Sequence, residues 1–130
     1  MKVAVGIGCD RGTSLATLEA ALSQALAEAG LSSEAIVLLA SITLKADEPG
    51  LLALAARLSR PLRFYSPEEL AAVPVPHPSE VVRRHTGTPS VAEAAALLAA
   101  GAGMEALIVE KHRYRGPDGR NATVSIARMS

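Results

Sequence analysis

Aromatic side chains are scarce in this sequence of 130 residues, which has one phenylalanine, two tyrosines and no tryptophan. Proteins that bind single-stranded nucleic acid usually stack the bases on aromatic rings, so we do not expect that function. An excess of one charge is also missing, because 13 basic residues balance 13 acidic ones. The chain therefore has no general attraction to nucleic acid or to an anionic membrane.

Cysteine occurs once, at Cys9, which rules out an intramolecular disulfide and a cysteine-based zinc cluster. His77 and His85 do not match a metal-binding spacing, so we predict neither a metal nor a cofactor. No apolar run approaches the roughly 20 residues of a membrane span, and no signal peptide is evident. A lone thiol suits a reducing compartment. We therefore expect a cytoplasmic protein.

The apolar residues follow patterns that alternate between strand and helix, which predicts one α/β domain over residues 1–130. Strands are expected at residues 2–8, 36–42, 62–65, 106–109 and 122–127. Helices are expected at residues 14–29, 47–58, 66–72, 79–84 and 90–100, with Asp47 as the cap of the second. This order predicts a three-layer α/β/α architecture with a mixed, mostly parallel sheet. A turn at residues 116–119 would close a C-terminal hairpin.

A glycine-rich segment, residues 6–13, joins the first predicted strand to the first helix. It is not a dinucleotide fingerprint, because Arg11 stands where that motif needs glycine, and it lacks the lysine of a P-loop. The segment either binds an anion or makes a tight turn, and its position at a strand end favours a ligand. Cys9 is either a nucleophile with a lowered pKa or a small, partly buried residue. The candidate ligand-binding residues here are Gly8, Cys9, Arg11, Gly12 and Thr13.

Charged residues after two other predicted strands are further candidates. Lys45 follows the second strand and would bind a carboxylate or phosphate as a point charge. Glu48 is either a general acid/base or an ion-pair partner of Lys45. Lys111 follows the strand at residues 106–109. It either binds a ligand or is a solvated charge on an edge strand that prevents aggregation.

The segment of residues 75–93 is rich in histidine, arginine and glutamate. Either Arg83 or Arg84 could bind a carboxylate. Ser90 would cap a helix together with Glu93, or bind an anion at that helix N-terminus. Glu93 is also the second candidate general acid/base.

These segments, taken in order, resemble the CobE/CbiG C-terminal domain family of corrin-ring biosynthesis. The resemblance covers nearly the whole chain, and the segments that carry it are residues 6–13, 40–51, 76–82, 87–96 and 122–128, with Lys111. It implies a three-layer α/β/α fold with a mixed sheet, in agreement with the pattern of apolar residues. Because the chain starts at the first strand of that domain, we expect a stand-alone version.

The resemblance implies two functions that involve corrin intermediates, which carry several acetate and propionate carboxylates. The first is to bind or chaperone a precorrin or hydrogenobyrinate-type intermediate, alongside other cobalamin-pathway enzymes. The alternative is a hydrolase-type enzyme or its accessory subunit, since larger members open a lactone on a cobalt-precorrin. In that case Glu48 or Glu93 would be the acid/base. We favour binding, because the sequence has no convincing pair of nucleophile and base.

Overall fold

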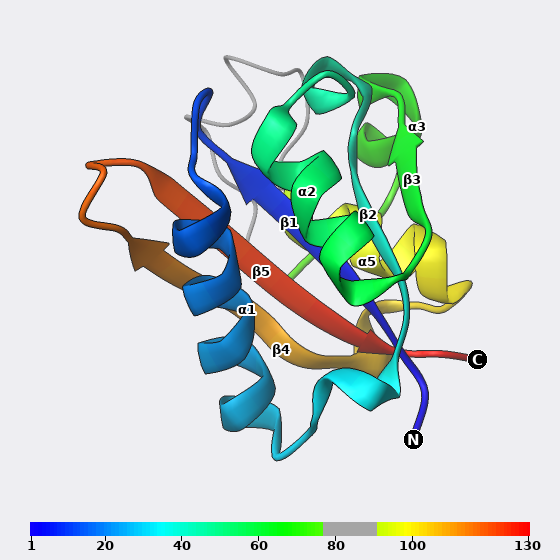
Figure 1. The fold of residues 1–130 in the computed structure, drawn as a ribbon. Coiled ribbons are helices and arrows are strands. Elements are labelled where there is room, and N and C mark those ends of the chain that lie inside the picture. Colours follow the sequence, from blue (N-terminus) through cyan, green and yellow to red (C-terminus); the bar gives the residue numbers. More distant parts are fainter. Residues whose placement is uncertain (77–90) are drawn as a thin grey trace.

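A computed structural model describes residues 1–76 and 91–130, in which five strands form one sheet in the order β3-β2-β1-β5-β4 (Figure 1). The strands are β1 (Val3–Cys9), β2 (Ile36–Ile42), β3 (Leu62–Tyr65), β4 (Leu107–Arg115) and β5 (Asn121–Arg128). β1 pairs in parallel with β2, and β2 with β3. β5 is antiparallel to both β1 and β4, so among these strands it alone runs against the others. The sheet is therefore mixed and ends in a hairpin, as predicted.

Helices cover both faces of the sheet (Figure 1). On one face lie α1 (Leu15–Ala29) and α2 (Pro49–Leu58), and on the other lies α5 (Val91–Ala100), with α3 (Pro67–Ala71) packed against it. Single 3₁₀ turns stand at Ser33–Ala35, Thr43–Lys45 and Met104–Ala106. The three-layer α/β/α prediction is confirmed. No helix in the described parts combines the length and apolar character that crossing a membrane requires.

The first strand is buried on both sides, which explains its unbroken apolar sequence. Val3, Val5 and Ile7 pack in the core beneath α1 and α2. Ala4 packs in the second core beneath α5. β1 is thus the strand around which both layers of helices are built.

Gly6 allows α5 to lie unusually close to β1. A methyl group at Gly6 would stand 1.9 Å from the carbonyl oxygen of Ala92, which no side chain can occupy. At Gly8 the same group would meet the Cβ atom of Val91 at 3.7 Å, an ordinary contact. The first turn of α5 therefore lies over the carboxyl end of β1.

Most predicted helix ends are confirmed. Ser14 caps α1 by accepting a hydrogen bond from the Thr17 amide, and Gly30 ends that helix in the left-handed conformation. α3 begins where predicted, and Ser66 and Glu69 form a capping box at its start. The predicted cap at Asp47 is wrong: α2 begins one residue later, after Glu48, whose side chain makes no capping bond to its own helix.

The fourth strand is longer than predicted. It continues to Arg115, so Lys111 lies inside β4 and does not follow it. A bulge sets two residues, Glu110 and Lys111, against Ser125 of β5, where the pairing shifts between Val109 and His112. Charged residues on this edge strand break the apolar alternation by which strands are recognised. β1 likewise extends to Cys9, which was expected in the turn.

Candidate ligand-binding site

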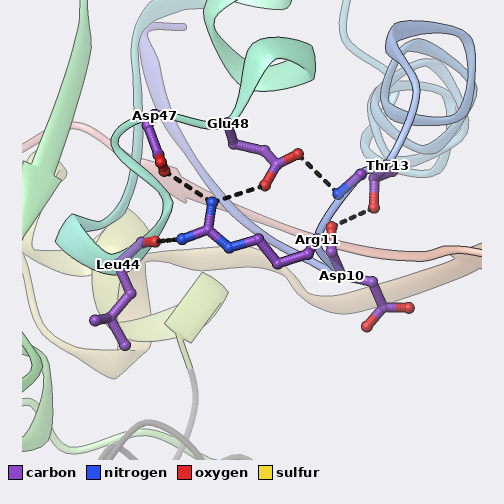
Figure 2. A network of polar contacts seen from close by, with 7 residues as sticks. Asp10, Arg11, Thr13, Leu44, Asp47 and Glu48 are labelled. Carbon is purple, nitrogen blue, oxygen red and sulfur yellow. Dashed lines mark hydrogen bonds and ion pairs between the residues drawn. The ribbon is translucent and has the colours of Figure 1, made fainter.

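Two loops meet at the carboxyl edge of the sheet, one after β1 (residues 10–14) and one after β2 (residues 43–48) (Figure 2). β1 and β2 are parallel neighbours, so their ends lie side by side. In α/β sheets this edge is where ligands bind. Five of the candidate residues proposed from the sequence fall on these two loops, namely Arg11, Gly12, Thr13, Lys45 and Glu48.

Arg11 connects the loops through three acceptors. Its Nη1 atom lies 2.7 Å from Asp47 Oδ1 and 3.3 Å from Glu48 Oε2, and its Nη2 atom donates to the Leu44 carbonyl oxygen (Figure 2). The side chains of Arg11 and Asp47 are 59% and 81% exposed, whereas that of Glu48 is 2% exposed. The hydrogen bond from Arg11 lowers the pKa of Asp47. Glu48 thus pairs with Arg11, and the predicted ion pair with Lys45 is wrong.

The other oxygen of Glu48 completes the junction. Its Oε1 atom accepts a hydrogen bond of 2.8 Å from the amide of Gly12. Gly12 has a φ of +77°, which glycine adopts readily and other residues rarely do. Both carboxylate oxygens of Glu48 are therefore engaged within the protein. This geometry favours a role in holding the loops together over the catalytic role considered from the sequence.

The amides of Thr13 and Ser14 in the first loop also have partners inside the protein. The Thr13 amide donates to the Asp10 carbonyl at 3.3 Å, and the buried Thr13 hydroxyl donates to the same oxygen at 2.6 Å. The Ser14 amide donates to Asp118 Oδ2 at 3.0 Å. Bonds from the amides of Ser14 and Arg120 lower the pKa of Asp118 to about 2. The anions that this glycine-rich turn holds are thus carboxylates of the chain itself.

Cys9 and Lys45 lie near each other beside this junction. Burial raises the pKa of the Cys9 thiol to about 11, although the positive charge of Lys45 acts in the opposite direction. This raised pKa is opposite to the lowered pKa that the nucleophile alternative assumes. Lys45 is half-buried at the end of a 3₁₀ turn, and within the described ranges its ammonium forms no ion pair.

Glu93 and Lys111 form a second charged pair, on the α5 face of the sheet. Lys111 Nζ lies 3.4 Å from Glu93 Oε1, with the two side chains 11% and 0% exposed. Neither oxygen of Glu93 accepts a hydrogen bond from the described residues. This pair joins α5 to β4, whereas Arg11 and Lys45 belong to the loops that follow β1 and β2.

The other candidate residues are distributed as follows. Gly8 lies in β1 beneath the start of α5. Ser90 lies outside the described residues, as do the predicted helix at residues 79–84 and the side chains at 77 and 83–85. Nowhere in the described ranges do three histidine, cysteine or carboxylate side chains converge as a metal ion would require.

Sequence reasoning missed Asp10, which fastens the first loop to β5. Its Oδ2 atom accepts hydrogen bonds from the amide and the side chain of Asn121, at 2.8 and 3.0 Å. The Asp10 amide in turn donates to the Asn121 carbonyl at 3.0 Å. These residues are 111 positions apart, so no local pattern in the sequence could have paired them.

Comparison with known proteins gives consistent sequence matches. Residues 3–127 match the family described as "Cobalamin synthesis G C-terminus". The "Cobalt-precorrin-5A hydrolase" of Priestia megaterium is 38% identical over 125 residues, or 96% of this chain and 32% of the hydrolase. The "Protein CobE" of a Sinorhizobium species is 42% identical over 110 residues, or 82% of this chain and 70% of that protein. The chain thus spans about a third of the hydrolase that it matches.

Solved structures show the same fold. The crystal structure of CobE, described as a protein from the cobalamin (vitamin B12) biosynthetic pathway, superposes with a TM-score of 0.83 at 38% identity and covers 98% of this chain and 93% of that one. The cobalamin biosynthesis protein ChiG of Agrobacterium tumefaciens superposes with a TM-score of 0.69 at 37% identity, covering 98% of both chains. The chain therefore belongs to the CobE/CbiG C-terminal family of cobalamin biosynthesis.

Proposed function

We propose that this protein binds a polycarboxylate corrin intermediate, of the precorrin or hydrogenobyrinate type, and carries it without changing it. Membership of the family gives the pathway. A ligand position at the carboxyl edge of β1 and β2 is supported by the charged loops that meet there (Figure 2). Such a carrier would pass its ligand to another enzyme of the pathway, in the cytoplasm.

The observation that carries the proposal is the ammonium group of Lys45. Lys45 is half-buried as a residue, and within the described residues its ammonium group has no ion-pair partner. The neighbouring Cys9 thiol cannot neutralise it, because the raised pKa keeps that thiol protonated. An ammonium group that has no counter-ion within the described residues is available to pair with a ligand carboxylate. Corrin intermediates supply several carboxylates around their rim.

The engagement of Glu48 favours binding over catalysis at this edge. A general base must reach a proton of the substrate, but both oxygens of Glu48 already accept from Gly12 and Arg11. The neutral Cys9 thiol is a poor nucleophile. The loops therefore offer a positive charge for recognition and no activated group for reaction.

The test is a titration of the purified protein with a hydrogenobyrinate-type corrin, followed by visible absorbance and by mass spectrometry. We expect tight binding with an unchanged ligand mass. Lys45→Glu should weaken binding at least about tenfold, because it replaces an attraction with a repulsion. Lys2→Glu is the matched control, since Lys2 is exposed at the opposite end of β1. Equal affinities of these two variants would contradict the assignment of Lys45.

A second candidate function is supported by the buried carboxylate of Glu93. An enclosed carboxylate whose oxygens accept no hydrogen bond from the described residues is costly unless it has a task. A relative of this chain is named a cobalt-precorrin-5A hydrolase, so Glu93 would act as acid/base on a corrin lactone. The test uses a precorrin that carries the lactone, because opening that lactone adds one water to the ligand. A mass increase of that size, lost in Glu93→Gln, would favour this candidate, and an unchanged mass would exclude it.

A further inference from the structure

We infer that Arg11 is a second carboxylate-binding group of the proposed corrin site, and that Asp47 occupies its outer side until a ligand carboxylate replaces it. This inference rests on the proposed function. It assigns to Asp47 the role of an internal competitor. On binding, a carboxylate of the ligand would replace that of Asp47, while the guanidinium of Arg11 stays in place.

The guanidinium of Arg11 is fixed from the protein side. Glu48, with 2% of its side chain exposed, approaches Nη1, and the Leu44 carbonyl oxygen accepts from Nη2 (Figure 2). The Nε atom donates to no acceptor among the described residues. An arginine held in this way keeps its planar set of donors in one orientation, and the planar fork suits a carboxylate.

Asp47 differs from Glu48 in exposure. Its carboxylate, 81% exposed, reaches Nη1 at 2.7 Å from the solvent side. Exposed ion pairs contribute little to stability, because water and salt screen them. Removing Asp47 from Arg11 therefore costs little, whereas removing the buried Glu48 would leave its carboxylate without that partner. The outer position is the one that a ligand can take.

Lys45 ends the 3₁₀ turn at Thr43–Lys45, and Asp47 follows it two residues later in the same loop. A ligand with one carboxylate must displace Asp47 without a further gain, whereas a ligand with several carboxylates also gains Lys45. The contact between Asp47 and Arg11 thus favours ligands of high negative charge.

The test compares wild type, Asp47→Asn and Glu34→Gln in titrations with a hydrogenobyrinate-type corrin at low and high salt. Glu34 is the matched control, since it is an exposed acid before β2, at the opposite edge of the sheet. We expect Asp47→Asn to bind about two to five times more tightly than Glu34→Gln at low salt, with a smaller gain at high salt. An Asp47→Asn affinity no higher than that of Glu34→Gln would overturn the inference.

A second readout follows the Asp47 carboxyl group directly by NMR in the wild-type protein. Arg11 lowers the pKa of this group, so its release should raise the pKa towards the ordinary value once the corrin is bound. An unchanged titration of Asp47 in the complex would also contradict the exchange. If wild type binds and Asp47→Asn gains nothing, this inference alone fails. If neither protein binds the corrin, the proposed function fails with it.

Discussion

The Oε1 atom of Glu48 lies 2.8 Å from the amide nitrogen of Gly12, and this hydrogen bond joins two loops that are 36 residues apart in the chain. The same carboxylate meets Arg11 through its other oxygen. Because Glu48 is buried and immediately precedes α2, it links the start of that helix to the turn before α1. Glu48 therefore helps to fix the relative position of the two loops, together with Arg11.

Substitution of Glu48 should destabilise the protein, although the residue lies in a loop at the carboxyl edge of the sheet and not in the apolar core. Glu48→Ala leaves the Gly12 amide without its acceptor and should lower the free energy of unfolding by about 1–3 kcal/mol. Glu48→Gln keeps one oxygen and should lose less. Urea unfolding measures both changes. Asp47→Ala, which removes the exposed acid beside the same arginine, should leave the midpoint nearly unchanged, and equal losses for the two alanine variants would contradict this ranking.

The close approach of α5 to β1 predicts opposite behaviour for two neighbouring glycines. Gly6→Ala places a methyl group 1.9 Å from the Ala92 carbonyl oxygen, so the helix must move. We expect a loss of about 3 kcal/mol or more, at the upper end of overpacking costs. Gly8→Ala makes only a 3.7 Å contact with Val91 and should cost less than about 1 kcal/mol. Similar thermal midpoints for the two variants would show that α5 does not pack as described.

Local signals explain most of what the sequence predicted correctly. The Ser66–Glu69 capping box and the stop at Gly30 depend on residues within a few positions of each other, so the pattern alone finds them. Strand β4 was predicted too short because its outer half is charged. An edge strand can carry such residues where its outer side faces water, and the apolar alternation then disappears.

The Cys9 thiol should resist alkylation. A pKa of about 11 leaves a thiolate fraction near pH 8 about 100 times smaller than that of an ordinary cysteine. Iodoacetamide labelling should therefore be slow in the native protein and fast in denaturant. Labelling at the rate of a free thiol in the native state would contradict this expectation.

The same pKa shift predicts a loss of stability at alkaline pH. The folded thiol holds its proton to a higher pH than the unfolded thiol, whose model value is 9.0. The protein should thus be unaffected below pH 9 and lose stability as the pH rises from 9 to about 11. Urea midpoints measured across this window should fall further for wild type than for Cys9→Ala. Parallel curves would count against the shift.

Asp118 predicts a loss of stability in acid. Its pKa of about 2 lies below the ordinary value of 3.8, because the Ser14 and Arg120 amides favour the carboxylate. This contribution is complete above about pH 4 and is lost as the pH falls towards 2. Asp118→Asn should consequently show a weaker acid dependence than wild type. An NMR titration of the Asp118 carboxyl with a midpoint near 4 would refute the assignment.

The candidate site was less predictable than the fold, because its contacts join distant segments. Sequence spacing favoured Lys45 as the partner of Glu48, three residues away, but Arg11 is the partner from 37 residues away. Likewise, the glycine-rich turn has the predicted affinity for an anion, yet Glu48 and Asp118 of the same chain satisfy it. Residue types indicated the chemistry, and only the folded chain decides which groups meet.

Strand β5, the last in chain order of the five strands that the structure describes, lies between β1 and β4 in the sheet. On the ribosome, β1 can pair with β2 early, but its other edge stays open until residues 121–128 emerge. An open edge of an apolar strand is a template for pairing with other chains. Closing it requires contacts between the two ends of the sequence, down to the bond from the Met129 amide to the Lys2 carbonyl. Slow translation of the C-terminal hairpin should therefore lengthen the period in which nascent chains aggregate.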